Sequence, residues 1–458
     1  MATFSIENFG CRATEADAAA LRSALLEKGL TPSAGHASAD VVVLNTCTVT
    51  AAADSQARDA IRKIHRANPG ACVVVTGCYA QRAPEELAAM EGVAWVVGNS
   101  HQAEIPDILQ GVVAQPARAD FFPLAQLEGA AMSLARGPAR ILTGDIFAQT
   151  AVQIAPATLM AGDRTRPILK IQDGCNNRCS YCVIPFVRGR SRSLPPDDVI
   201  REVWTLVDAG AREIVLSGIN LGSYGRDLVP RAGLAGVVQR ILDETELEQL
   251  RFSSIEPQDI TEDFVALVAS SDRLAPHFHA PLQSGSDRIL RAMHRWYRSE
   301  HYAERVSLIR RALADAAIGA DVIAGFPGET EEDFRATFAF IERQPFTYLH
   351  VFSFSTRPGT AAANLGGAVR LESIRERARS LRALGLRKSE EFRRAQAGRA
   401  VRALTLGRGG QDWTEALTGN YLKLRIPGRH PVNEWHDIRI PADAQDLADP
   451  ATPARSAR

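Results

Sequence analysis

The sequence predicts an α/β protein in three parts: an N-terminal parallel α/β domain, a central partial (β/α)6 barrel and a small C-terminal β-barrel. Three observations predict this. Short β-branched runs alternate with helical segments over residues 1–112, and a strand-helix alternation recurs over residues 167–358. Short strand-like runs separated by Gly, Pro and Asn then follow residue 396. Strands joined by helices favour parallel sheets, in which the loops beyond the carboxyl ends share one edge.

Length and composition limit the number of domains and the class of protein to be expected. A chain of 458 residues exceeds one ordinary core, so two or three domains are expected, and 45% hydrophobic and 23% charged residues are typical of a soluble globular protein. A formal net charge of zero excludes a uniformly basic nucleic-acid binder. We find no signal peptide and no apolar run of the ~20 residues that a membrane span needs. We therefore expect a cytoplasmic protein, whose seven cysteines are reduced or bind metal.

Three cysteines of the N-terminal domain, residues 1–112, are expected to converge. Cys11, Cys47 and Cys78 each fall just past a predicted strand, and parallel strands end at a common edge. Cys72 lies near the other end of its strand, roughly 20 Å from that edge at ~3.3 Å per residue, so we expect it in the core. Three separate small buried residues are the alternative. The predicted strands are Phe4–Phe9, Asp40–Leu44, Ala71–Val75 and Val93–Val97, and the helices are Glu15–Lys28 and Ala52–Ala67.

The most specific stretch is the triplet C-x3-C-x2-C formed by Cys175, Cys179 and Cys182, directly after the predicted strand Ile168–Gln172. Structural zinc takes four ligands, usually in two C-x2-C pairs, and no fourth Cys or His lies nearby. Three thiolates suit a 4Fe-4S cluster in which one iron stays open for another ligand. This spacing matches the radical S-adenosylmethionine (radical SAM) enzymes. An incidental cluster of buried cysteines is the alternative.

Polar or special residues follow each predicted barrel strand, where such barrels gather their chemistry. Glycines at these places are often only turn residues, but five consecutive strand ends with such residues favour a cofactor pocket. Phosphate is not the expected ligand, because neither a Walker motif nor a dinucleotide motif is present. The six strands are Ile168–Gln172, Glu213–Ser217, Leu250–Ser254, His277–Pro281, Gly319–Ile323 and Tyr348–Phe354. The helices between them include Asp197–Asp208, Leu234–Asp243, His301–Ala316 and Thr330–Ile341.

The remaining segments connect or follow these parts. Residues 113–166 show no clear period and are expected to be a linker, and residues 442–458 a disordered tail. The helical segment Leu371–Arg402 is strongly basic with interleaved acids, so it is either a solvated linker helix or an RNA-facing one. The C-terminal strands are Arg402–Leu406, Trp413–Ala416, Tyr421–Ile426 and Asp437–Ile440. Candidate RNA contacts are Lys423, Arg425, Arg429, Arg439, Tyr421 and Trp413.

Nearly the whole chain resembles the radical SAM methylthiotransferases. The resemblance is carried by Gly10-Cys11, Asn45–Val49, Thr76–Cys78 and the Cys175 triplet extended through Pro185. Within the family, Lys170–Asn176 followed by Ser217–Leu228 is similar to the branch that modifies N6-threonylcarbamoyladenosine at position 37 of tRNA. Sister branches act on isopentenyladenosine in tRNA or on an aspartate of a ribosomal protein. Thr14, Asn220 and a short version of the C-terminal TRAM barrel depart from the usual pattern.

The resemblance implies a methylthiotransferase domain over residues 1–112, a radical SAM domain over 167–395 and a TRAM-like RNA-binding domain over 396–441. It implies two 4Fe-4S clusters, one on the Cys175 triplet that cleaves S-adenosylmethionine, the other on Cys11, Cys47 and Cys78 that carries the sulfur to be donated. The product would be the 2-methylthio base. The cofactor contacts expected from it are Tyr181, Ser217, Gly218, Glu256, Gln283, Arg295 and Gly325.

The partners implied are the anticodon loop of tRNA with adenosine 37 and an electron donor such as flavodoxin or ferredoxin, the enzyme being a monomer without membrane contact. Two other classes compete with this interpretation. A zinc-stabilised RNA-binding protein would need no catalysis, and a simple electron carrier would need neither an open iron nor a large barrel.

Overall fold

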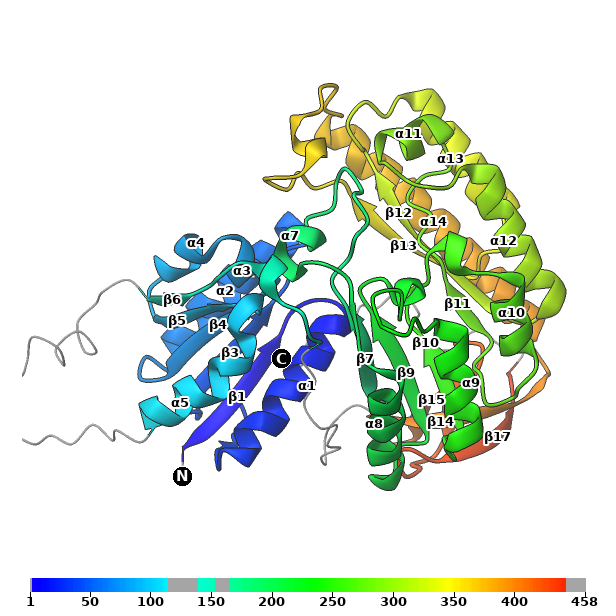
Figure 1. Ribbon diagram of the computed structural model, residues 1–458. Coiled ribbons are helices and arrows are strands. Elements are labelled where there is room, and N and C mark those ends of the chain that lie inside the picture. The colour runs from blue at the N-terminus through cyan, green and yellow to red at the C-terminus, as the bar shows by residue number, and fades with distance from the viewer. Residues whose placement is uncertain (1, 114–138, 153–164, 442–458) are drawn as a thin grey trace, which may run out of the picture. The chain divides into compact units, whose positions relative to one another are not determined.

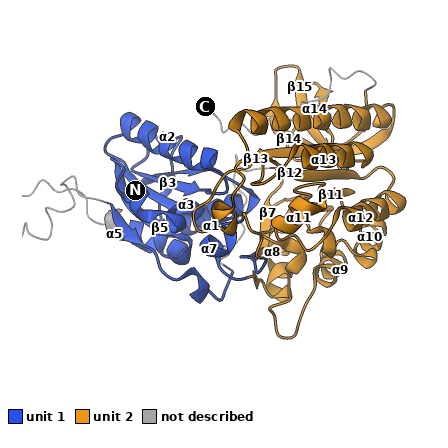
Figure 2. Ribbon diagram, turned by 90° about the horizontal axis from the view of Figure 1, so that it is seen from above, with its two compact units in different colours: residues 1–157, 173–177, 182–190 blue, residues 158–172, 178–181, 191–458 orange. Residues whose placement is uncertain are grey.

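The computed structural model describes residues 2–113, 139–152 and 165–441, and the chain forms two compact units (Figure 2). Unit 1 comprises residues 1–157, 173–177 and 182–190, and unit 2 comprises residues 158–172, 178–181 and 191–458. The cysteine triplet is therefore divided: Cys175 and Cys182 belong to unit 1, and Cys179 belongs to unit 2. Among the helices that the structure describes, none combines the length and the apolar composition that a membrane span requires.

Unit 1 is built on a six-stranded parallel sheet of order β2-β1-β3-β4-β5-β6 (Figure 1). The four predicted strands are confirmed as β1 (Thr3–Asn8), β3 (Val41–Thr46), β4 (Cys72–Gly77) and β5 (Val93–Gly98). Two short edge strands were not predicted, β2 (Thr31–Pro32) and β6 (Arg140–Leu142). Because β6 pairs with β5, part of the segment expected to be a linker belongs to the sheet. Strand β6, with three residues, is too short to give a periodic signal.

Both faces of this sheet are covered, which explains its uninterrupted β-branched runs. Val42 and Leu44 face one core, where α2 contributes Ile61, and Val41 and Val43 face the other, where α1 contributes Leu25. Helix α1 begins at Arg12, earlier than predicted, because Cys11 already occupies the N-cap position. The helices are α1 (Arg12–Glu27), α2 (Ala51–Ala67), α3 (Cys78–Arg82), α4 (Pro84–Ala88), η1 (Asn99–Glu104), α5 (Ile105–Val113), η4 (Ile146–Ala148) and α7 (Ile184–Arg188).

Unit 2 contains the predicted barrel strands in parallel pairs. They form one sheet of order β10-β9-β7-β8 and one of order β11-β12-β13, and the bridges Leu250–Leu274 and Ser254–His279 join the two. The strands are β7 (Ile168–Asp173), β8 (Arg192–Ser193), β9 (Glu213–Gly218), β10 (Gln249–Phe252), β11 (His277–His279), β12 (Ala317–Ala324) and β13 (Tyr348–Ser353).

The helices of unit 2 include two α-helices that were not predicted, α10 and α11, each of eight residues or fewer, and the short 3-10 helices η5, η6 and η7 were not predicted either. The basic helix α14 ends at Gln396 rather than at Arg402, because β14 begins at Ala400. The helices are α8 (Pro196–Asp208), η5 (Leu221–Ser223), α9 (Leu234–Glu244), η6 (Pro257–Asp259), α10 (Glu262–Ala269), α11 (Asp287–Ala292), α12 (Ser299–Ala312), α13 (Glu331–Arg343), η7 (Ala361–Asn364) and α14 (Leu371–Gln396).

The C-terminal part of unit 2 is a four-stranded antiparallel sheet of order β16-β15-β14-β17. Its strands are β14 (Ala400–Gly409), β15 (Trp413–Thr418), β16 (Lys423–Pro427) and β17 (Trp435–Arg439), close to the predicted runs. Tyr421, a candidate RNA contact, is half-buried: it stacks on His277 with ring centroids 4.3 Å apart and lies under the guanidinium of Arg251. Its ring is used for packing against the barrel.

A buried ion pair joins this sheet to the barrel. Arg251 of β10 donates to Glu213 of β9 at 2.6 Å and to the carbonyls of Thr418 and Gly419 at 3.2 and 2.8 Å. Both charged side chains are fully buried.

Arg251→Ala should therefore lower the free energy of unfolding by about 3–5 kcal/mol, since it leaves Glu213 buried without its principal charge partner. The matched control is Arg240→Ala, which breaks an exposed pair with Glu244 and should leave the free energy of unfolding nearly unchanged. Urea unfolding followed by circular dichroism measures both. Equal losses in the two variants would contradict the assigned role of Arg251.

Candidate functional site

Cys11, Cys47 and Cys78 gather at one edge of the unit 1 sheet. They follow β1, β3 and β4, which are adjacent in the sheet, and the register aligns these strand ends: Asn8 pairs with Asn45, and Thr46 pairs with Gly77. Cys47 directly follows β3, and Cys78 is the first residue of α3. The arrangement agrees with the expected convergence of these three side chains.

Two glycines allow the close approach of these segments. Gly10 has φ +140°, and a Cβ placed on it would lie 2.7 Å from the Cβ of Cys47. Gly77 has φ +96°, and its Cβ would lie 2.4 Å from the carbonyl oxygen of Thr46. A side chain at either position would push Cys11 or Cys78 away from Cys47, which is why glycine precedes two of the three cysteines.

Cys47 and Cys78 are buried in polar surroundings, whereas Cys11 is exposed. Burial, together with neighbouring Cys11 and Cys78, raises the pKa of the Cys47 thiol to about 12. The Cys47 sulfur accepts a hydrogen bond from the Val49 N–H at 3.4 Å, and the Cys78 sulfur accepts from Arg188 Nε at 3.3 Å. Burial also raises the pKa of the Cys78 thiol, so Cys47 and Cys78 keep their protons unless a metal centre displaces those protons on coordination.

Cys72 provides the internal comparison. It is the first residue of β4, pairs with Val41 at the opposite end of the strand from Cys78, and packs against the hydrophobic core with Phe4, Val74 and Val97. Burial raises the pKa of its thiol to about 11.

We predict that Cys72→Ala changes neither iron content nor activity, because its thiol lies about 20 Å along the strand from the cysteine edge. Iron and sulfide analysis of the anaerobically purified variant measures this. A loss of iron would show that a different set of cysteines binds the metal.

The loop of the triplet contributes Cys175 and Cys182 to unit 1. The Cys175 N–H donates to the Gly189 carbonyl at 3.1 Å, and the Cys175 sulfur accepts from the Asn177 N–H at 3.4 Å. The residues that follow Cys182 pack directly on the N-terminal trio, since Cys78 shares a hydrophobic cluster with Val183 and Val187. The buried Arg188, at the end of helix α7, was not predicted as a site residue.

In unit 2, Cys179 lies beside two predicted cofactor residues. Arg295 donates from Nη1 to the Cys179 sulfur at 3.3 Å, from Nε to the Tyr297 hydroxyl at 3.1 Å, and forms an ion pair with Glu256. Burial raises the pKa of Glu256, although Arg295 opposes this shift. The structure thus brings together Cys179, Glu256 and Arg295.

The other predicted cofactor residues lie at strand ends of unit 2. Ser217 and Gly218 end β9, where the neighbouring Asn220 N–H donates to Gln172 Oε1 at 2.8 Å. Gln283 has φ +65°, and its N–H donates to the Asp321 carbonyl at 2.8 Å. Gly325 has φ +81° and donates its N–H to Glu329. Tyr181 packs beside Phe326 and Met293.

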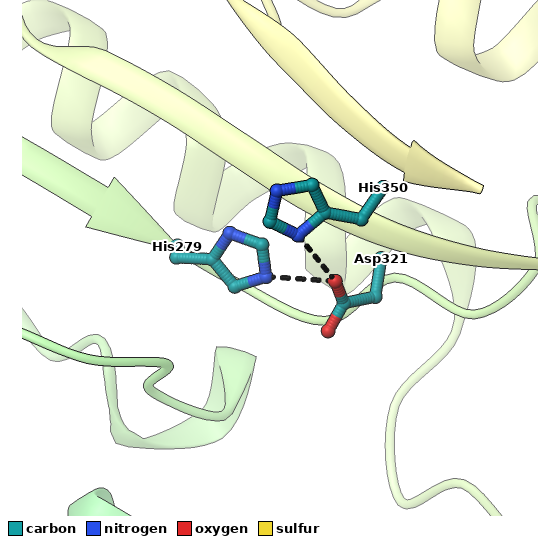
Figure 3. Close-up of side chains that lie close together, drawn as sticks. All are labelled: His279, Asp321 and His350. Carbon is teal, nitrogen blue, oxygen red and sulfur yellow. Dashed lines mark hydrogen bonds and ion pairs between the residues drawn. The ribbon is translucent and has the colours of Figure 1, made fainter. Parts of the chain in front are cut away.

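A polar triad across three barrel strands was not predicted. Asp321 of β12 accepts hydrogen bonds at Oδ1 from His279 Nε2 of β11 at 2.9 Å and from His350 Nδ1 of β13 at 3.2 Å (Figure 3). Burial favours the neutral acid, but both imidazoles hold the pKa of Asp321 well below its usual range. The sequence signal that could have indicated this triad is the presence of polar residues at alternate positions of predicted strands.

The donor set fits iron-sulfur clusters better than single ions. Among the described residues, the group with three ligating atoms within 4.8 Å of one another is His279, Asp321 and His350, and neither cysteine trio has that single-ion spacing. N–H groups donate to the sulfurs of Cys47, Cys78, Cys175 and Cys179. Such hydrogen bonds are a recognised feature of cluster sites, where they set the reduction potential.

The family models divide the chain as the fold does. Residues 3–98 match the "Uncharacterized protein family UPF0004", and residues 169–341 match the "Radical SAM superfamily". Among solved structures, the radical S-adenosylmethionine methyltransferase TsrM from Kitasatospora setae, with cobalamin and a [4Fe-4S] cluster bound, superposes with TM-score 0.56 at 17% identity. The match covers 79% of this chain and 77% of that one. Fold and cysteine loop thus define the class as a radical SAM protein.

Curated relatives narrow the class. The chain is 36% identical to the threonylcarbamoyladenosine tRNA methylthiotransferase MtaB of Aquifex aeolicus, over 95% of this chain and 99% of that one, and 38% identical to MtaB of Bacillus subtilis, over 97% and 98%. It is 36% identical to the tRNA-2-methylthio-N(6)-dimethylallyladenosine synthase of Syntrophobacter fumaroxidans, over 80% and 76%. The chain belongs to the radical SAM methylthiotransferase family.

Proposed function

We propose that this protein is a tRNA methylthiotransferase that converts N6-threonylcarbamoyladenosine at position 37 to its 2-methylthio derivative by radical SAM chemistry. The observation that carries the proposal is the pair of cysteine trios. One stands at three adjacent strand ends of the N-terminal sheet, and the other follows the first strand of the barrel. A carbon–hydrogen bond of adenine is beyond the reach of a side-chain base, so a cofactor must supply the reactive species.

The lengths of the relatives support the branch. Identity alone does not separate the candidates, since the MtaB proteins are 34–38% identical and the dimethylallyladenosine synthases 33–36%. The chain, however, spans 96–99% of the three MtaB proteins and only 76–82% of those synthases. The alternative function remains the methylthiolation of isopentenyladenosine in tRNA or of a ribosomal-protein aspartate.

Each cysteine trio would have its own role in the reaction. Cys175, Cys179 and Cys182 would hold the 4Fe-4S cluster that, when reduced, cleaves S-adenosylmethionine to the 5′-deoxyadenosyl radical. Arg295 neutralises Glu256 and donates to Cys179, and these contacts keep the Glu256 carboxylate oriented beside Cys179. Cys11, Cys47 and Cys78 would hold the cluster that carries the sulfur.

The tRNA would be bound in part by the C-terminal sheet. Arg425, Arg429 and Arg439 are exposed there, and Lys423 is half-buried. Trp413 lies under Arg425, whose guanidinium carbon is 4.6 Å from the ring centroid. Cations of this kind bind phosphates irrespective of base sequence. A flavodoxin or ferredoxin would supply electrons to a monomeric enzyme acting in the cytoplasm, where its substrate is found.

Mass spectrometry of tRNA nucleosides from a deletion strain tests the substrate. We expect the 2-methylthio form of threonylcarbamoyladenosine to disappear and its unmodified precursor to accumulate, with restoration by the intact gene. Persistence of that nucleoside while another methylthio product vanishes would assign the protein to a sister branch. Metal analysis distinguishes this enzyme from a zinc-stabilised RNA-binding protein, since the latter would be colourless with about one zinc per chain.

A further inference from the structure

Arg188 occupies a position that the proposed chemistry leaves unexplained. It is the last residue of helix α7, six residues after Cys182, and only 2% of its surface is exposed. An arginine is almost never buried unless it is paired, because its charge cannot be removed by deprotonation. Its position therefore depends on its partners.

Those partners link three separate segments of unit 1. Arg188 Nη2 donates to Asp17 of α1 at 2.7 Å, and Nη1 donates to both carboxylate oxygens of Asp173 at 3.1 and 3.2 Å. The remaining nitrogen, Nε, donates to the sulfur of Cys78 at 3.3 Å. Asp17 follows Cys11 by six residues, and Asp173 precedes Cys175 by two. One guanidinium thus ties together the segments that carry Cys11, Cys78 and Cys175.

A second donor approaches the same sulfur. Asn99 Nδ2 lies 3.6 Å from Cys78 Sγ and is fixed by a 2.8 Å bond to the Val187 carbonyl, next to Arg188. Among the N-terminal cysteines, the described contacts give Cys78 two side-chain donors, one of them cationic, whereas the donor recorded to Cys47 is a backbone N–H. Hydrogen bonds to cluster sulfurs, net charge and burial are what set cluster potentials.

We propose that Arg188 is a positioning residue that holds the N-terminal cysteines against the loop of Cys175 and raises the reduction potential of the cluster they bind. This inference rests on the proposed function, since it requires a cluster on Cys11, Cys47 and Cys78. The geometry supports it because the planar fork satisfies both carboxylates and still directs Nε to sulfur. A lysine ammonium lacks this planar fork, so Arg188→Lys keeps the charge but not the oriented contact of Nε with the sulfur.

Arg295 offers a matched control. It too is buried, pairs with a carboxylate (Glu256) and donates to one cluster cysteine, but that cysteine is Cys179 of the other trio. Each arginine should therefore influence one cluster only.

The experiment uses the full chain with Cys175, Cys179 and Cys182 replaced by alanine, so that only the N-terminal cluster is present. Its midpoint potential is measured by redox titration followed by electron paramagnetic resonance. In this background we expect Arg188→Lys and the double variant Asp17→Asn/Arg188→Gln to shift the midpoint to more negative values. Arg295→Lys should leave it unchanged. The double variant removes one positive and one negative charge, so its net charge equals that of the parent.

Unchanged midpoints in both Arg188 variants, or an equal shift in Arg295→Lys, would overturn the inference. Should either Arg188 variant lose its iron, thermal unfolding decides: loss at an unchanged melting temperature supports the positioning role, and loss with a general drop in melting temperature refutes it. A parent background that binds no iron would instead refute the N-terminal cluster itself, and with it the proposed function.

Discussion

Replacing Cys175 by alanine is expected to abolish the cleavage of S-adenosylmethionine. A cluster with one open iron needs three protein thiolates, and the triplet supplies them as Cys175, Cys179 and Cys182, so the variant is left with two. The measurement is 5′-deoxyadenosine released after reduction with dithionite, quantified by liquid chromatography.

Two controls accompany this result. Cys72→Ala should release as much 5′-deoxyadenosine as the unmodified protein, because Cys72 belongs to the core of the sheet. The N-terminal variant described next should also retain cleavage. Undiminished release from Cys175→Ala would show that the C-x3-C-x2-C triplet does not bind the cofactor, and the assignment of the barrel site would fail.

Replacing Cys47 by alanine is expected to separate the two halves of the reaction. Cys47 stands directly after β3 between Cys11 and Cys78, and it belongs to the trio that would carry the donated sulfur. The variant should release 5′-deoxyadenosine within experimental error of the unmodified protein, while the methylthio nucleoside falls below detection. Both products are measured in one reaction with tRNA that carries threonylcarbamoyladenosine.

Cys47→Ser is the conservative companion, since a hydroxyl is a poor ligand for iron but nearly the same size as the thiol. It should behave like Cys47→Ala. Formation of the methylthio product by either variant would remove the N-terminal trio from the mechanism. Loss of both products in both variants would mean that Cys47 supports the fold rather than the sulfur donor.

The positions of the cysteines could be predicted because strand ends leave a local signal. Runs such as Val41–Leu44 are buried on both faces, and their β-branched residues indicate a strand directly. The end of the strand then determines where the cysteine that follows it lies. Six barrel strands were recovered for the same reason. Short elements such as β6 and α11 span too few residues to show a period.

The long-range side-chain contacts could not be predicted in this way. Arg188 and Asp17 are 171 positions apart, and the triad of His279, Asp321 and His350 depends on which faces of three strands turn inward. Tyr421 illustrates the same limit: an aromatic residue near a turn indicates a stacking surface, but its stacking on His277 is visible only in the fold. Charge and aromaticity identify a side chain that needs a partner, but only the tertiary structure supplies the partner.

The most direct test of the two-cluster arrangement is the iron and sulfide content of the anaerobically reconstituted protein. We predict about eight of each in the unmodified chain and about four in each of two triple variants, one lacking Cys11, Cys47 and Cys78 and the other lacking Cys175, Cys179 and Cys182. Two results would contradict the two-cluster arrangement. One is about four iron and four sulfide in the unmodified chain with none left in the variant that lacks the triplet, and the other is a colourless protein with about one zinc.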